Sequence, residues 1–124
     1  MRDPDIEVRF IFNGERNHPA ADGYRPAHLL NGKYLTTGIH HYYETNSVAP
    51  NESAIGTITF VSPEYYQHSL SVGETIQMQE GKRIVGSATV LRIMNPMLDR
   101  NYADDMQRVG QPYSAEAVEN RDLL

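Results

Sequence analysis

The feature of this chain that most constrains its fold is a succession of short, strand-like segments separated by turn residues. In the first segment, apolar side chains occupy every second position: Ile6, Val8, Phe10 and Phe12. A period of two places all four on one face of a β-strand. Helix-period patterns are almost missing before residue 95. Because a chain of short strands must protect its sheet edges, the pattern predicts a closed antiparallel barrel.

The remaining strands are predicted from β-forming residues bounded by turn signals. They cover residues 27–30, 33–37, 39–45, 54–61, 75–79 and 83–94. Asn31-Gly32 favours a tight turn because both residues tolerate positive φ, and Gly81 gives the connection 80–82 the same freedom. Gly86 would allow a close backbone approach or a bulge. The prolines and glycines of residues 13–26 predict a long ordered loop rather than a helix.

Length and composition narrow the class of protein. The 124 residues fit one compact domain, and the apolar runs are too short to span a bilayer, so no membrane partner is expected. Cysteine is absent, which excludes disulfides and thiolate chemistry and fits a reducing cytoplasm. No apolar segment follows Met1 at once, so no secretory signal is expected.

The charge balance bears on partners. A net charge of −5 argues against nonspecific attraction to phosphate backbones, and no DNA partner is expected. A local basic patch is still compatible with this net charge, because most of the positive charge lies within the first hundred residues: Arg9, Arg16, Arg25, Lys33, Lys82, Arg83 and Arg92. A mixed, solvated surface is the alternative. Residues 96–124 form a polar tail with one modest helical signal at 114–119, predicted to be partly mobile unless it docks.

Sites for catalysis or metal binding are not visible in the sequence. His40 and His41 are neighbours on a predicted strand, so their side chains face opposite sides and cannot readily share one metal ion. His18, His28 and His68 match no HExxH or similar spacing. The chain also has no GxSxG and no GxxxxGK[ST] pattern. We therefore expect no metal, no cofactor and no enzymatic activity.

Three sequence segments carry a resemblance to a known family. They are Arg16-Asn17-His18-Pro19 followed by Gly23-Tyr24-Arg25-Pro26, the turn Val48-Ala49-Pro50-Asn51-Glu52, and the hairpin Glu80-Gly81-Lys82-Arg83-Ile84-Val85-Gly86. With them, residues 6–95 resemble the C-terminal β-barrel, the third domain, of elongation factor Tu. The resemblance implies an all-β, six-stranded closed antiparallel barrel over residues 1–95 as a stand-alone domain, with residues 96–124 as a tail.

The resemblance also implies a binding surface, because the family's barrel helps to hold the T stem of aminoacyl-tRNA. Positions that match Arg16, Thr36, Glu80 and Gly81 lie at or near that surface in the family. The candidate contacts to RNA or to a partner are Arg16, His18, Arg25, Thr36, Glu80, Gly81, Lys82 and Arg83. Arginine can pair with phosphate through two hydrogen bonds, and a glutamate can accept from a ribose 2′-hydroxyl.

A structural role for some of these residues is the alternative interpretation. Arg16 and Arg25 can instead fix the loop through Asp22, Glu15 or backbone carbonyls. Tyr24 is expected to be a packing residue.

Departures from the family pattern affect the functional expectation. Gln79 stands where arginine is usual, Ala20-Ala21 replace bulky aromatics, Lys82 replaces glycine, and residues 63–73 form a longer loop. These departures and the acidic balance favour a non-catalytic module that binds a protein of the translation machinery, or a toxin that targets it, as a decoy or immunity protein. The alternatives are binding of tRNA or another structured RNA, and a structural fragment that other domains complete in trans.

Overall fold

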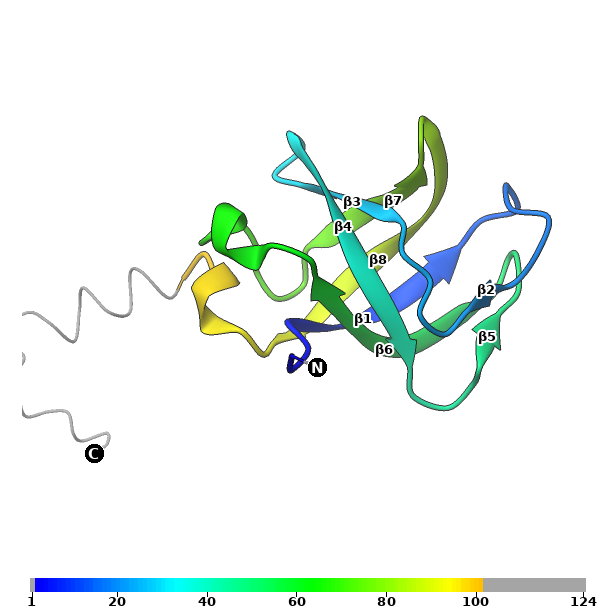
Figure 1. The fold of residues 1–124 in the computed structure, drawn as a ribbon, viewed down its shortest axis with the longest axis horizontal. Coiled ribbons are helices and arrows are strands. Elements are labelled where there is room, and N and C mark those ends of the chain that lie inside the picture. The colour runs from blue at the N-terminus through cyan, green and yellow to red at the C-terminus, as the bar shows by residue number, and fades with distance from the viewer. Residues whose placement is uncertain (1, 102–124) are drawn as a thin grey trace, which may run out of the picture.

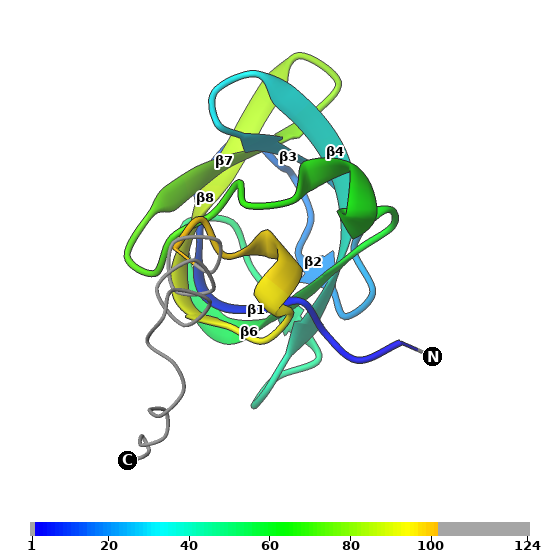
Figure 2. The same ribbon diagram turned by 90° about the vertical axis from the view of Figure 1, so that its left-hand side faces the viewer.

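The barrel is closed. The computed structural model describes residues 2–101, and in it six antiparallel strands follow the order β1-β6-β4-β3-β7-β8, with β8 pairing back to β1 (Figures 1 and 2). Their bounds are β1 Ile6–Phe12, β3 Ala27–Leu30, β4 Tyr34–Tyr42, β6 Ser53–Phe60, β7 Thr75–Glu80 and β8 Arg83–Ile93. The predicted all-β, six-stranded closed barrel is confirmed.

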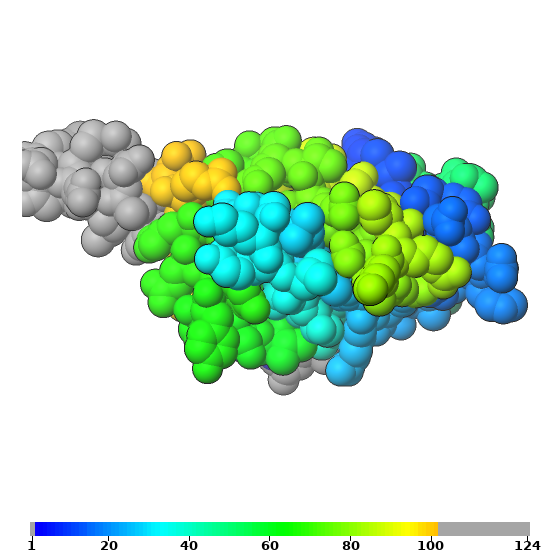
Figure 3. Space-filling model, turned by 90° about the horizontal axis from the view of Figure 1, so that it is seen from above, coloured from blue at the N-terminus to red at the C-terminus, as the bar shows by residue number. Residues whose placement is uncertain are grey.

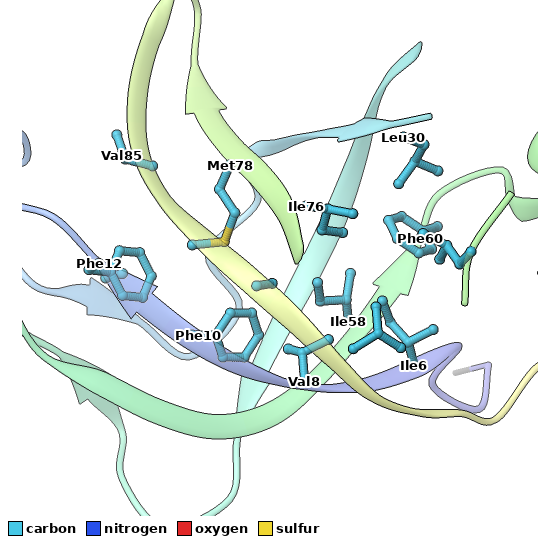
Figure 4. Close-up of a cluster of buried hydrophobic side chains, with 14 of the residues drawn as sticks. Ile6, Val8, Phe10, Phe12, Leu30, Ile58, Phe60, Ile76, Met78 and Val85 are labelled. Atoms are coloured by element: carbon cyan, nitrogen blue, oxygen red, sulfur yellow. The ribbon is translucent and has the colours of Figure 1, made fainter. Parts of the chain in front are cut away.

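The core forms from the inward positions of these strands. In β1, Ile6, Val8, Phe10 and Phe12 are buried, as the alternation predicts. They meet apolar side chains from the opposite wall, among them Met78 (Figure 4). Burial of one face per strand is the main stabilising term for such a barrel.

One predicted strand break is wrong. Residues 33–37 and 39–45 were expected to be separate, but β4 runs without interruption through Gly38. Position 38 of this strand has no room for a side chain, because the ring of His28 and the side chain of Ile58 occupy the space where a Cβ would lie. A Cβ on Gly38 would lie 2.9 Å from His28 Cε1 and 2.5 Å from Ile58 Cγ2. This glycine therefore makes room for a buried ring and ends no strand.

The predicted glycine turns are present. Asn31 and Gly32 have φ of +55° and +65°, and Gly81 has +59°. A Cβ on Gly86 would lie only 2.3 Å from the carbonyl oxygen of Ile11, so β1 and β8 approach closely there, and the β7–β8 register shifts beside it. The predicted positive φ of Gly81 and the predicted close backbone approach at Gly86 are confirmed.

The loop of residues 13–26 is ordered and not helical, as predicted. Its short strand β2 (Ala20–Ala21) pairs with β5 (Ser47–Val48) outside the barrel. Beyond β2 the loop runs along β4, where Gly23 N donates to His40 O (2.7 Å) and His40 N donates to Tyr24 O (2.9 Å). These hydrogen bonds place Tyr24 at one end of the barrel.

The other end is covered by two short 3₁₀ helices, η1 (Pro63–Tyr66) and η2 (Pro96–Leu98), as Figure 2 shows. Leu98 is fully buried, and its carbonyl accepts from Leu70 N at 2.9 Å. Arg100 then donates to Asn31 Oδ1 (2.7 Å). Residues 96–101, the first part of the predicted tail, thus pack against the barrel. The rest of that tail, with the helical signal at 114–119, lies outside the described residues.

A buried carboxylate ties the chain together near the N-terminus. Asp5 is fully buried, and it accepts from Phe60 N (2.7 Å), from Asn95 Nδ2 (2.8 Å) and from Arg2 Nη2 (2.8 Å). Since β1 begins and β8 ends beside it, Asp5 holds three segments in place. Sequence reasoning missed this role. Across residues 2–101, no helix is long and apolar enough to cross a membrane.

Candidate functional site

Two of the three segments singled out in the sequence, residues 16–26 and 80–86, meet at one end of the barrel. They form a set of four residues that we call the rim cluster: Arg16, Tyr24, Glu80 and Arg83. The loop after β1 (blue) and the β7–β8 hairpin (yellow-green) lie toward the same end in Figure 3, and the β3–β4 hairpin (cyan) lies toward the other. Glu80 is at the centre. Its Oε2 accepts from Arg16 Nη1 and from the Tyr24 hydroxyl, and its Oε1 accepts from Arg83 Nη2 at 2.8 Å.

Arg16 makes more bonds than the one to Glu80. Its Nε donates to the carbonyl of His18 and its Nη2 to that of Pro19, both at 3.2 Å. The guanidinium lies 4.5 Å from the centroid of the Tyr24 ring, and the side chain is only 20% exposed. Every nitrogen of this guanidinium thus has an internal partner. The loop-fixing interpretation through backbone carbonyls is confirmed for Arg16, with Glu80 as its acidic partner in place of Asp22 or Glu15.

The groups of the rim cluster stabilise one another's protonation states. The hydrogen bond from Tyr24, followed by the interactions with Arg83 and Arg16, lowers the pKa of Glu80. Burial and the hydrogen bond to Glu80 raise the pKa of Tyr24. At neutral pH, Glu80 is therefore an anion shared by two cations and one neutral hydroxyl donor. Two positive charges and one negative charge leave this part of the rim weakly positive.

The other predicted contacts near the rim are exposed. His18 and Arg25 lie in the loop, Gly81 and Lys82 form the tip of the β7–β8 hairpin, and all four are exposed. In the described part of the chain, no hydrogen bond or ion pair engages the side chain of Arg25 or of Lys82. Whether these residues bind RNA or a protein stays a prediction.

The prediction that Thr36 contributes to the surface is wrong. Its side chain is only 6% exposed, because Thr36 shares the inward face of β4 with His40. The length of the β3–β4 connection explains the error. The predicted strands 27–30 and 33–37, joined by a two-residue turn, would pair Leu30 with Lys33, whereas the structure pairs Leu30 with Tyr34. One added residue in a connection exchanges the two faces of the returning strand.

The same register brings two histidines together in the core, which sequence reasoning missed. We call His28, His40 and Tyr42 the core histidine chain. His28 Nδ1 lies 3.3 Å from the carbonyl oxygen of Thr36, the two Nε2 atoms of His28 and His40 lie 2.9 Å apart, and His40 Nδ1 lies 3.1 Å from the Tyr42 hydroxyl. All three side chains are at most 2% exposed.

One proton arrangement satisfies the whole core histidine chain. A carbonyl can only accept, so His28 Nδ1 carries its hydrogen and His28 Nε2 is an acceptor. His40 Nε2 must then donate, which leaves His40 Nδ1 to accept from the Tyr42 hydroxyl. Both rings are neutral in this arrangement.

Burial favours the same neutral state. It lowers the pKa of His28 to about 4 and, with the neighbouring His28, lowers the pKa of His40 well below its usual range. Burial also raises the pKa of Tyr42. The prediction that His40 and His41 face opposite sides is confirmed, since His40 is buried and His41 is exposed. In the sequence, Gly38 was the one sign that a large side chain packs against the inward face of β4. That this side chain is His28, and that it contacts His40, depends on the strand register.

No group of three or more potential metal ligands gathers anywhere in residues 2–101. Neither a scan against models of protein families nor a search of curated proteins returned a match for this chain.

Proposed function

We propose that this chain is a non-catalytic binding module, similar to the third domain of elongation factor Tu as a stand-alone barrel, that engages a protein partner through its rim. The partner belongs to the translation machinery or is a toxin directed against it, in a reducing cytoplasm. The observation that carries the choice of a protein over RNA is the engagement of Glu80 by both Arg16 and Arg83.

The proposal follows from what the rim offers to a ligand. Phosphate recognition by arginine uses free N–H groups in a fork geometry. Arg16 already uses three of its five N–H groups on internal partners, and the buried Thr36 cannot offer its hydroxyl at the surface. The exposed cations that remain are Arg25 and Lys82, and Lys82 lies two positions along the hairpin from the shared anion Glu80. A surface of mixed charge with a few free cations suits an acidic patch on a protein.

Two structural features support the resemblance to elongation factor Tu. Two of the segments that carry it, residues 16–26 and 80–86, are distant in sequence but joined in space by the rim cluster. The six-stranded closed barrel is also the architecture that the resemblance implies. The contacts between these two segments support the proposal that this end of the barrel is similar to the corresponding end of the elongation factor Tu domain.

The experiment is affinity capture with reversal of the rim charges. The double variant Arg25→Glu, Lys82→Glu and the control Lys33→Glu, an exposed cation at the β3–β4 hairpin, are compared with the unmodified chain on lysate with and without nuclease treatment. We expect proteins retained by the unmodified chain and by the control to be lost from the double variant. Retention that is equal for all three, or that disappears with nuclease treatment, would count against a protein partner at the rim.

A second candidate, binding of tRNA or another structured RNA, is favoured by one observation: Arg25 and Lys82 are exposed cations without an acidic partner in the described residues. Titration of tRNA at two salt concentrations tests it. Binding through these two residues would weaken with salt and fall further in the double variant. Absence of binding at low salt removes this candidate.

A further inference from the structure

A depression on the surface of the barrel is lined by none of the rim-cluster residues. It has a volume of about 390 Å³ and is lined by Tyr43, Glu44, Thr45, Ser53, Ala54 and Ile55. These residues come from the segment that leaves β4 and from the first half of β6, near the bottom of the molecule in Figure 1. We call this site the Tyr43 depression.

The aromatic wall of the Tyr43 depression is held in place. The Tyr43 hydroxyl donates to Glu7 Oε2 (2.6 Å), and the Tyr43 backbone N donates to Ile55 O (3.0 Å). The ring also meets the His41 ring edge to face, with centroids 6.1 Å apart. The Tyr43 side chain is nevertheless 45% exposed. A fixed ring with an open face is ready to contact a ligand without losing further conformational entropy.

The polar wall carries an unused negative charge. Glu44 is exposed, and within residues 2–101 its carboxylate has no ion pair and no hydrogen bond. The neighbouring carboxylates already have partners: Glu7 forms an ion pair with Arg92 at 3.7 Å, and Asp22 Oδ1 accepts from Tyr42 N at 2.8 Å and lies 3.1 Å from His41 Nδ1. The free charge at the Tyr43 depression is therefore that of Glu44.

An open aromatic face, two apolar residues and one free carboxylate suit a long side chain that ends in a cation. The aliphatic part of such a side chain can lie along Ala54 and Ile55 while its head reaches polar groups. A guanidinium or ammonium over the Tyr43 ring gains a cation–π interaction, and it can pair with Glu44. An anionic ligand would be repelled by Glu44.

We infer that the Tyr43 depression receives an arginine or lysine side chain of the protein partner. This inference rests on the proposed function, because it supplies a second contact to that partner. The rim would hold an acidic patch and the Tyr43 depression a basic side chain, so the two sites together would fix the orientation of the partner.

The test is a titration of the ¹⁵N-labelled chain of 124 residues with the capped peptide Gly-Arg-Gly, followed by amide chemical shifts. The matched probe is the same peptide with citrulline, which keeps the shape of arginine but lacks its charge. We expect shifts concentrated at residues 43–45 and 53–55, with dissociation constants of roughly 1 mM or weaker, as for a small, solvent-exposed contact. Citrulline should bind clearly more weakly.

Two variants sharpen the result. Glu44→Gln should weaken the binding of the arginine peptide about two- to fivefold, as expected for one exposed ion pair. Glu64→Gln, which removes an exposed carboxylate on η1, should leave binding unchanged. The inference is overturned by absence of shifts at the depression, by equal binding of citrulline, or by an unchanged affinity in Glu44→Gln.

This outcome is separable from that of the proposed function. Failure of the peptide titration removes the basic side chain as occupant and leaves the rim experiment intact. If the rim experiment succeeds, Glu44→Gln should also reduce retention of the same captured protein. Unchanged retention in that variant counts against the Tyr43 depression alone.

Discussion

At the scale of single residues, side chains of the same type are held by internal partners in one place and are exposed in another. Arg16 and Arg25 lie in the same loop, yet Arg16 donates to Glu80 and to the carbonyls of His18 and Pro19, whereas Arg25 is exposed. Glu80 creates this difference because its carboxylate accepts from Arg16. Glu80 is therefore the residue on which the architecture of the rim depends.

Replacement of Glu80 by glutamine should destabilise the barrel by about 1 kcal/mol at neutral pH, because two guanidinium groups lose their shared anion. Urea unfolding measures the effect. The pKa of Glu80 is lowered in the folded chain, so the stabilisation is present above the usual carboxylate range and is lost as pH falls through the lowered pKa. The difference between the two proteins should therefore shrink in acid. The control Glu64→Gln should show no loss at either pH.

The core histidine chain makes the fold sensitive to acid. Unfolded histidines bind protons near pH 6.5, whereas His28 stays neutral in the fold down to a pKa of about 4. Stability is thus complete above that range and decreases as pH falls from 6.5 to about 4, by on the order of 3 kcal/mol for His28 alone. His40 acts in the same direction.

Urea unfolding between about pH 7 and pH 4 measures this loss. His28→Gln is expected to be less stable at neutral pH but to have a flatter pH dependence. His41→Gln, which changes an exposed ring, should keep the slope of the unmodified chain. A constant free energy of unfolding across the window would contradict the neutral, buried arrangement.

At the scale of elements, the barrel depends on a few positions where backbones come close or the register changes. The connection of residues 31–33 sets the register of β3 and β4, and so decides that His28 and Thr36 both face inward. Gly86 lets β8 approach β1 at the pair that closes the barrel. The elements themselves follow from alternation, whereas their alignment follows from these local features.

Substitution of Gly86 by alanine should weaken barrel closure. A Cβ there would lie 2.3 Å from the carbonyl oxygen of Ile11, and a backbone atom cannot move away as a flexible side chain can. We expect a loss of about 3 kcal/mol in the free energy of unfolding, at the upper end for overpacking. Ser87→Ala, at the next position of β8, is the control and should change stability much less. Equal stabilities of the two variants would show that the close approach carries no cost.

At the scale of the whole molecule, both ends of the barrel are held by segments outside the six strands. Asp5 joins the start of β1 to Phe60 and Asn95, and at the same end η2 places Leu98 in the core. Arg100 extends this attachment to the β3–β4 hairpin. The rim cluster does the equivalent at the opposite end. Closure of a small barrel thus needs its connections as well as its strands.

Leu98→Ala tests whether the segment after β8 is part of the folded unit. Removal of a fully buried leucine side chain typically costs about 2–5 kcal/mol, and we expect a loss in this range. The exposed Leu91 supplies a control of the same chemistry, and Leu91→Ala should cost less than about 1 kcal/mol. Thermal unfolding of both variants measures the difference. A Leu98 variant as stable as the Leu91 variant would mean that residues 96–101 add nothing to the barrel.

The part of the fold that could be predicted from sequence is the part that depends on neighbours along the chain. Alternation in β1, the positive φ of Asn31 and Gly32, and the opposite orientations of His40 and His41 all follow from local geometry. For the candidate site, the sequence identified the charged residues of the rim. It did not identify their pairing, because Arg16 and Glu80 are 64 positions apart.

The sequence by itself determined an all-β chain of short amphipathic strands and the few turns that need positive φ, because side-chain alternation and backbone sterics act over only a few residues. The tertiary structure decided which groups are available to a partner. It turned Thr36 inward, joined His28 to His40, and neutralised part of the charge of Arg16 with Glu80. These outcomes depend on strand register and barrel closure, and a shift of one residue in either would exchange the buried and the exposed side chains.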